Sequence, residues 1–208
     1  MSAVPAIATP ALASLIAERR VWRGRPAALP PSTQPTGYAA LDAALPTRGW
    51  PEASLSEILL PADGVGELQI VLPTLARLTR AGQRVAIIAP PYLPYAPAWQ
   101  AAGVDLTQLS IVDAPAREMA WAMEQALRSG CCGAVLGWLT QADDRTLRRL
   151  EVAADTGHAL GFVFRDRVAL GNPSPAALRL EVSPDQLRIH KCRGGNPLAP
   201  IAFARTHA

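Results

Sequence analysis

From residue 36 onward, short apolar runs alternate with segments of helical periodicity, and this alternation restricts the possible folds more than any other feature of the chain. Strands are predicted over residues 53–60, 84–90, 109–114, 133–139 and 159–164. Apolar strands that are separated by helices are typical of a parallel sheet with helices on its faces. The sequence therefore predicts an α/β fold with three layers and a mostly parallel sheet.

Helices are predicted before and between these strands, and an antiparallel hairpin is predicted after the last of them. The helices are expected over residues 36–45, 66–82, 115–130 and 143–156. Thr36 is expected to cap the first helix, and Pro115 to occupy the first position of the third. Residues 177–203 indicate a hairpin that turns near Pro184 and ends in a short extended tail.

The N-terminal region differs in composition from the rest and is expected to form a helical arm on a proline-rich tether. Leu12, Leu15 and Ile16 recur at helical spacing, and prolines are concentrated after them. Proline-rich segments favour extended backbone and act as semi-rigid spacers. Two regions are therefore predicted, an arm and tether over 1–35 and a folded domain over 36–208.

Charge and cysteine content exclude several classes of protein. The chain has 20 Lys and Arg against 17 Asp and Glu, a formal net charge of +3, which permits contact with nucleic acid without arguing for it. Its three cysteines are too few for a disulfide framework and lack the spacing of a zinc site. No apolar run approaches the roughly 18 residues of a membrane span, and the N-terminus does not fit a signal peptide. We expect a reduced, cytoplasmic protein without metal or cofactor.

The turn after the first strand has the layout of a phosphate-binding loop but lacks its reactive groups. Such a loop has the form G-x-x-x-x-G-K-[ST], in which the lysine meets the outer phosphates and the hydroxyl holds magnesium. With Gly66 as the second glycine, Pro61 replaces the first, Glu67 the lysine and Leu68 the hydroxyl, and Gly64 lies between. A plain turn with glycines for backbone freedom explains the same residues. A degenerate nucleotide loop is therefore predicted.

A second requirement of magnesium-dependent nucleotide hydrolysis is an acidic residue at the end of a later apolar strand. The candidate strand is 133–139, and Trp138 occupies the position where the aspartate is expected. The next acids, Asp143 and Asp144, lie beyond the strand and are better placed to cap the following helix and to charge its first turn. No catalytic residue is therefore predicted.

The order of these segments resembles a known family. The runs TGYAALDAAL, SEILLPADGVGELQIVLPTLARL, RVAIIAPPYLPYAPAWQAAGVDLTQLSIVDA, GAVLGWL and RIHKCRGGNPLAPI follow one another as in the core of RecA-type recombinases. The VWRG start, GVGELQ and GWL together resemble the ImuA family, a SulA-like and RecA-like group encoded with SOS mutagenesis genes. The resemblance covers nearly the whole chain and implies a degenerate RecA-like core.

This resemblance implies that nucleotide chemistry has been lost. The glutamate that activates water in RecA proteins would follow the AIIA run, where Pro90 stands. With Glu67, Leu68 and Trp138 in the other positions, a pseudo-ATPase is expected. The implied function is that of a non-catalytic accessory subunit in SOS-induced, error-prone translesion DNA synthesis, a mutagenic form of DNA repair. The implied partners are ImuB, an error-prone C-family DNA polymerase and, as a further candidate, RecA.

Four basic residues are candidates for contact with DNA or a partner protein. Arg165 and Arg167 follow a core strand at the carboxyl edge of the sheet, where ligands bind in open α/β folds. Lys191 and Arg193 resemble a basic pair that, in RecA filaments, reaches toward the nucleotide of the neighbouring subunit. Solvent exposure on a strand explains this second pair equally well.

The N-terminal arm is the sharper candidate for a partner contact. Its apolar residues lie beside arginines, and aromatic and arginine side chains are enriched in binding hot spots. The candidate contact residues are Leu12, Leu15, Ile16, Arg20, Val21 and Trp22. In RecA-type proteins an N-terminal helix docks on the neighbouring protomer, so the resemblance implies an intermolecular role. A helix that folds back on its own domain is the alternative.

Two other functions fit parts of the sequence. A SulA-like inhibitor of cell division in the SOS response shares the GWL region, although the long part after Arg165 counts against it. A nucleotide-binding RecA-like ATPase with an unusual site would have to bind ATP in spite of Glu67 and Leu68. The three alternatives differ in their partners, so the identity of the partner separates them.

Overall fold

The computed structural model describes residues 29–62, 66–195 and 199–203. The predicted arm lies outside these ranges. In chain order, the elements are α2 (Ala39–Ala44), β1 (Ser54–Leu60), α3 (Glu67–Arg80), β2 (Arg84–Ile88), α4 (Ala96–Ala101), η1 (Leu106–Gln108), β3 (Leu109–Val112), α5 (Met119–Arg128), β4 (Cys132–Trp138), α6 (Asp144–Gly157), β5 (Leu160–Asp166), η2 (Arg167–Gly171), β6 (Leu178–Val182), β7 (Gln186–Cys192) and β8 (Ile201–Ala202).

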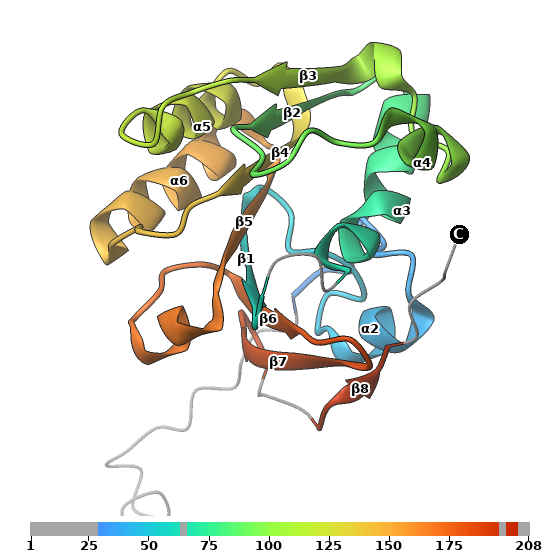
Figure 1. Ribbon diagram of the computed structural model, residues 1–208. Helices are drawn as coiled ribbons and strands as arrows, with labels where there is room; N and C mark the ends of the chain where they lie inside the picture. The colour runs from blue at the N-terminus through green and yellow to red at the C-terminus, as the bar shows by residue number, and fades with distance from the viewer. Residues whose placement is uncertain (1–28, 63–65, 196–198, 204–208) are drawn as a thin grey trace, which may run out of the picture.

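One sheet of eight strands forms the centre of the molecule, in the order β3-β2-β4-β5-β1-β6-β7-β8 (Figure 1). The strands β1 to β6 run parallel, β7 is antiparallel to β6, and β8 is antiparallel to β7. The predicted mixed α/β fold, with a mostly parallel sheet and a C-terminal antiparallel hairpin, is confirmed. The tail after the hairpin supplies the last strand.

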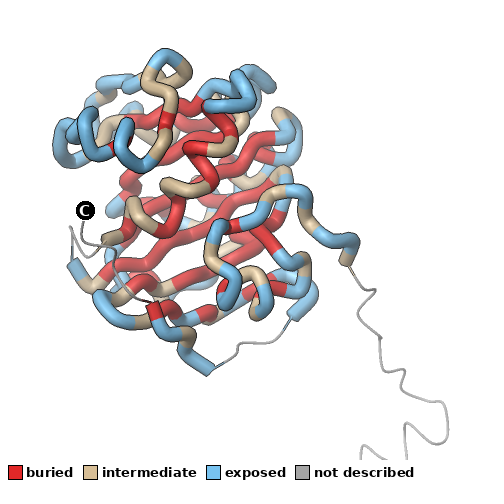
Figure 2. Tube along the Cα trace, turned by 90° about the vertical axis from the view of Figure 1, so that its right-hand side faces the viewer, coloured by how far each residue is buried: buried red, intermediate tan, exposed pale blue. Residues whose placement is uncertain are grey.

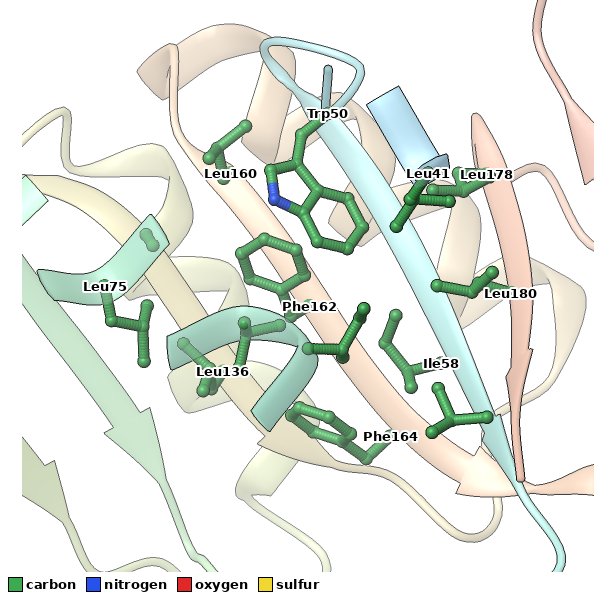
Figure 3. Packing of buried hydrophobic residues seen from close by; sticks show 14 of the residues in the cluster. Leu41, Trp50, Ile58, Leu75, Leu136, Leu160, Phe162, Phe164, Leu178 and Leu180 are labelled. Carbon is green, nitrogen blue, oxygen red and sulfur yellow. The ribbon is translucent and has the colours of Figure 1, made fainter. Parts of the chain in front are cut away.

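Helices cover both faces of the sheet, because successive side chains of each strand point to opposite faces. The helices α2, α3 and α4 pack on one face, around Trp50, Ile58 and Phe162 (Figure 3). Trp50 and Phe162 meet edge to face, with ring centroids 5.0 Å apart, and the Trp50 indole donates to Thr74 Oγ1 (2.8 Å). We call this cluster the α2/α3 core.

The helices α5 and α6 pack side by side on the opposite face and form a second cluster, the α5/α6 core. Met123 and Leu127 of α5 are fully buried there against strand residues such as Leu55 and Val135. Figure 2 shows the buried strands inside a more exposed layer of helices and loops. Among the described helices, none combines the length and the apolar character needed to cross a membrane.

Two helix starts differ from the sequence expectation. Thr36 does not cap α2: Tyr38 precedes the helix, and Thr36 Oγ1 instead accepts from the Tyr38 N–H (3.1 Å). The helix α5 begins at Met119 rather than at Pro115, because a turn comes first in which the Glu118 N–H donates to Pro115 O (2.7 Å). Proline fixes its own φ without selecting between a turn and a helix.

The end of the predicted tether is attached to the domain. The Ser32 N–H donates to Thr47 O (2.6 Å), and the Trp50 N–H donates to Gln34 O (2.8 Å). The side chain of Gln34 also accepts from Arg77 Nη2 of α3 (2.6 Å). Residues 32–34 therefore belong to the packed structure, while the proposed boundary between residues 35 and 36 stays a prediction.

Candidate functional site

The turn between β1 and α3 lies where a phosphate-binding loop was considered. The residues at the positions of its lysine and hydroxyl are buried or pack against the core. Gly66 precedes the helix with φ 96°, a left-handed conformation that suits glycine. Glu67 begins α3 and is 8% exposed, and Leu68 packs against the α2/α3 core. Pro61 is half-buried just after β1, and Gly64 lies outside the described residues. The positive end of the helix dipole thus meets a carboxylate of the chain itself.

Trp138 ends β4 at the position where a metal-binding aspartate was considered. Its ring stacks on Phe164 of β5, with centroids 4.6 Å apart and an interplanar angle of 20°. The indole Nε1 has no hydrogen-bond partner within the described structure. Pro90 follows the carboxyl end of β2, is half-buried, and has no side-chain group that accepts a proton. The carboxyl edge is therefore occupied by apolar side chains at both positions.

A cavity of about 210 Å³ lies at this carboxyl edge. The ends of β1, β4 and β5 and the residues that follow them line it, namely Leu60, Ala62, Trp138, Thr140, Phe164, Arg165 and Asp166. Pockets for cofactors and drug-sized ligands span roughly 300–1,000 Å³. The hollow that the described residues enclose is thus below the size of an ordinary nucleotide site.

A buried carboxylate holds two arginines beside this edge, and we call the three residues the Glu57 triad. Glu57 of β1 has an exposed fraction of 0%. Its Oε1 accepts from Arg165 Nη1 of β5 and its Oε2 from Arg179 Nε of β6, each at 2.6 Å. Glu57 lies opposite Arg179 in one parallel ladder and opposite Val163 in the other, so Arg165, two residues after Val163, shares the same face.

Backbone carbonyls accept further N–H groups of the two arginines. Arg165 Nη2 donates to Ala142 O (2.7 Å), and Arg179 Nη2 donates to Ala169 O of η2 (2.7 Å). Removing one partner of such a buried charge pair leaves an uncompensated charge, which is strongly destabilising. The triad thus fastens the loop after β4 and the η2 segment to the centre of the sheet.

The triad corrects the expectation for Arg165. This residue was predicted to contact DNA or a partner, but it is 4% exposed and its guanidinium bonds to Glu57. A guanidinium that already neutralises a buried carboxylate is not presented to an external phosphate. Arg165 therefore has a structural role, whereas Arg167, two residues later in η2, is exposed.

The other basic candidates lie near the amino ends of the parallel strands, at the opposite end of the sheet from the cavity. Because β7 is antiparallel, Lys191 and Arg193 lie toward the amino ends of the parallel strands, away from Arg167. Lys191 Nζ donates to Ser174 O (2.6 Å), and partial burial lowers the Lys191 pKa. Arg193 is 52% exposed and forms an ion pair with Glu151 of α6. Contact of Arg167, Lys191 and Arg193 with DNA or a partner stays a prediction.

Two members of the triad were missed from the sequence, although a signal was present. Glu57 interrupts the apolar strand SLSEILL, and Arg179 interrupts the apolar strand LRLEV. A charge within a strand that is buried on both faces requires a partner nearby. Two such interruptions of opposite sign indicate that the strands are neighbours, and this is the arrangement observed.

Cysteine and histidine positions offer no metal centre in the part of the chain that the structure describes. These residues contain no group of three or more His, Cys, Asp or Glu that could hold a metal ion. Cys131 is exposed and Cys132 is half-buried at the start of β4. Burial, and to a lesser degree the neighbouring Cys131, raises the pKa of the Cys132 thiol above its ordinary value.

Comparison with known sequences places this arrangement in a family. Residues 53–161 match the family described as "Cell division inhibitor SulA", which is a little over half of the chain. The chain belongs to the SulA family. The matched part runs from just before β1 into the beginning of β5 and includes α3 to α6. It contains Glu57 but neither arginine of the triad.

Curated relatives in the SulA family share parts of the chain. The cell division inhibitor SulA of Photorhabdus laumondii is 42% identical over 69 residues, or 33% of this chain and 37% of that protein. SulA of Yersinia enterocolitica is 30% identical over 122 residues, or 53% of this chain and 67% of that protein. This chain therefore spans little more than a third of the first relative and two thirds of the second.

The crystal structure of SulA from Pseudomonas aeruginosa is similar to part of the chain. It is 25% identical, covers 55% of this chain and 98% of the solved chain, and superimposes with a TM-score of 0.47.

Proposed function

We propose that this SulA-family chain is a non-enzymatic protein of the SOS response that inhibits cell division by binding a component of the division machinery. The observation that carries the proposal is the match of residues 53–161 to a family described as a cell division inhibitor. The two curated relatives carry the same description. Activity and partners of the whole chain are part of the proposal, because the relatives are matched over only part of their length.

The carboxyl edge of the sheet supports a mode of action without ATP turnover. Glu67 places a carboxylate at the start of α3, and Leu68 and Trp138 are apolar where metal ligands are needed. A protein of this kind would act by occupying its target rather than by chemistry. Calorimetry should accordingly detect no binding of ATP at millimolar concentration. ATP binding that is weakened by Arg193→Ala would instead favour a nucleotide-sensing protein.

Co-purification from DNA-damaged cells tests the proposed partner. The full chain, tagged at its C-terminus and expressed from its own promoter, should retain a protein of the division machinery after damage. Recovery of a DNA polymerase complex without any division protein would overturn the proposal. An untagged strain and a strain with an unrelated tagged SOS protein serve as controls.

A second function is supported by the part of the chain that the family match does not cover. Residues 162–203 contribute β6, β7 and β8, and the complete order of strands supports a RecA-like core. The resemblance to the ImuA family would then make the chain an accessory subunit of translesion synthesis. Its proposed partners are ImuB, an error-prone C-family DNA polymerase and RecA.

Damage-induced mutation frequency tests this second function. Deletion of the gene should lower the frequency of resistance mutations after ultraviolet irradiation if the chain supports translesion synthesis. The deletion strain could instead keep its mutation frequency and no longer form filaments after damage. That result would leave cell division inhibition as the function.

A further inference from the structure

Eight large apolar side chains are exposed on the described surface, and five of them belong to the terminal strand β3 or to the loop that follows its neighbour β2. Tyr92, Leu93 and Tyr95 lie in the loop between β2 and α4 and are 71%, 86% and 70% exposed. Ile111 and Val112 of β3 are 49% and 37% exposed. We call these five residues the β3 edge surface. Apolar residues gathered in this way mark sites of protein interaction.

The two segments of this surface are neighbours in space. The Ala89 N–H at the end of β2 donates to Val112 O of β3 (2.8 Å), and the loop that begins with Pro90 follows immediately. The loop therefore leaves the sheet beside the carboxyl end of β3. The carboxyl end of β3 and the first residues of this loop are therefore neighbours.

The strand β3 presents unpaired main-chain groups beside these side chains. It is the terminal strand of the sheet and pairs only with β2 among the described strands (Figure 1). Val112 O points toward β2, so the N–H and C=O of the preceding residue, Ile111, point away from the sheet. Natural edge strands are commonly protected by Lys, Pro or a bulge. Short length also protects an edge strand, and LSIV has only four residues, but it contains none of these three features.

The charges around β3 are few and mostly acidic. Between Arg84 and Arg117 the sequence contains only two charged residues, Asp105 before β3 and Asp113 directly after it. Asp105 comes before η1 and accepts from the Thr107 N–H (2.9 Å), whereas Asp113 follows β3 directly. An apolar strand whose flanking segments carry acids and no basic residue is complementary to an extended apolar segment with basic ends.

We propose that the β3 edge surface binds an extended apolar segment of a partner protein, with Lys or Arg at its ends, which joins the sheet as a strand beside β3. In strand addition the main-chain hydrogen bonds supply affinity, and pockets for alternate side chains supply specificity. The inference rests on the proposed function only in that a binding protein needs a docking surface. It deepens that function by naming the surface and the chemistry of the segment.

Peptide binding to the purified full chain tests the inference. The probe is a fluorescent peptide of alternating Val and Thr with Lys at both ends. It should bind saturably by anisotropy and protect the Ile111 amide from hydrogen exchange. The same peptide with Glu ends should bind more weakly, and N-methylation of the amides along one of its edges should abolish binding, because that edge can no longer donate.

Two variants of one residue separate docking from folding. Ile111→Pro removes an N–H that does not bond to β2, a position where edge strands tolerate proline. Ile111→Lys keeps the main chain and adds a charge that repels the basic ends. Each should weaken peptide binding about tenfold, the effect of a lost hydrogen bond and apolar contact. Val152→Lys on α6, where Val152 is 54% exposed, is the matched control and should bind as the wild type does.

Several outcomes would overturn the inference. Absence of saturable binding would show that the β3 edge surface does not bind such a segment. Binding by both Ile111 variants as tight as that of the wild type would show that the peptide binds elsewhere. A peptide of residues 8–28 of this chain that competes at Ile111 would identify its own N-terminal segment as the occupant. A dimer that Ile111→Lys dissociates would identify a second copy. If cells still fail to divide in any of these cases, the proposed function survives and only the docking surface is rejected.

Discussion

At the scale of single residues, Glu57 joins three strands of the sheet, although the sequence did not single it out. Its carboxylate is fully buried and accepts from two arginines on two different strands. The three side chains together carry one net positive charge. Replacement of Glu57 would leave two buried arginines without a counter-charge, so the energetic role of the triad can be tested directly.

Replacement of Glu57 by Gln should lower the free energy of unfolding by about 3–5 kcal/mol, because two arginines lose their counter-charge in a buried site. Urea denaturation followed by circular dichroism measures the change. Glu118→Gln, which breaks the exposed pair with Arg117, is the control and should cost no more than about 1 kcal/mol. Equal stability of the Glu57 variant and the wild type would show that the triad is not formed.

Asp143 makes the stability of α6 depend on pH. Hydrogen bonds from the side chain and then the main chain of Thr146 lower the Asp143 pKa below its ordinary value. A carboxylate whose folded pKa is lowered stabilises the fold above its unfolded pKa, about 3.9, and loses this contribution as the pH falls through the folded pKa. Asp143→Asn should therefore be less stable than the wild type at neutral pH but not in acid.

The difference in urea midpoint between wild type and Asp143→Asn, followed from neutral pH down to about pH 2, measures this effect. Asp155→Asn, near the other end of the same helix, is the control. A carboxylate there opposes the helix dipole, so its removal should not destabilise the protein at neutral pH. If the difference in urea midpoint between the wild type and Asp143→Asn stays the same in acid, the lowered pKa of Asp143 is not its cause.

At the scale of elements, the strands and most of the helices were predicted from periodicity alone. The five predicted strands, β1 to β5, and the hairpin agree because short apolar runs bounded by turn residues favour strands. The start of α5 was wrong, because Pro115 fits a turn as well as a helix. The helix α4 was not predicted, and its six residues, APAWQA, carry little periodic signal.

The turn between β1 and α3 should resist conversion into a phosphate site. Glu67→Lys with Leu68→Thr introduces the lysine and the hydroxyl of a phosphate loop, but the positions where the two acids are expected still hold Trp138 and Pro90. No ATP hydrolysis above the unmodified chain is expected in a phosphate-release assay. Turnover that magnesium stimulates would show that acids elsewhere complete the site. Because Leu68 packs on the core, a thermal transition of the double variant is needed as a control for folding.

The hairpin beyond the family match should be indispensable to the domain. A chain that ends after Asn172 loses β6, the neighbour of β1, and leaves Glu57 with one arginine instead of two. We expect it to be insoluble or to lack a cooperative thermal transition. A chain that ends after Phe203 keeps every described strand and should behave as the full chain does. A cooperative transition in the shorter chain would show that the matched family region folds without the hairpin.

At the scale of the whole molecule, the sequence predicted the layers but not the order of the strands. Periodicity is a local property, whereas strand order depends on which crossovers bury the most apolar surface together. For the same reason the sequence could not show that the four basic candidates lie apart. Arg165 is buried in the sheet, and Lys191 and Arg193 lie near the amino ends of the parallel strands, away from Arg167. The exposed side chains around β3 were missed because exposure is a tertiary property of apolar residues.

Cell length after induced expression tests the central claim most directly. Production of the full chain in undamaged cells should give multinucleate filaments, because a division inhibitor acts by binding and needs no other SOS function. Glu57→Gln, made at the same rate, should give filaments only to the extent that it folds. Cells of normal length, at a level of soluble wild-type protein equal to that in damaged cells, would contradict the proposed function.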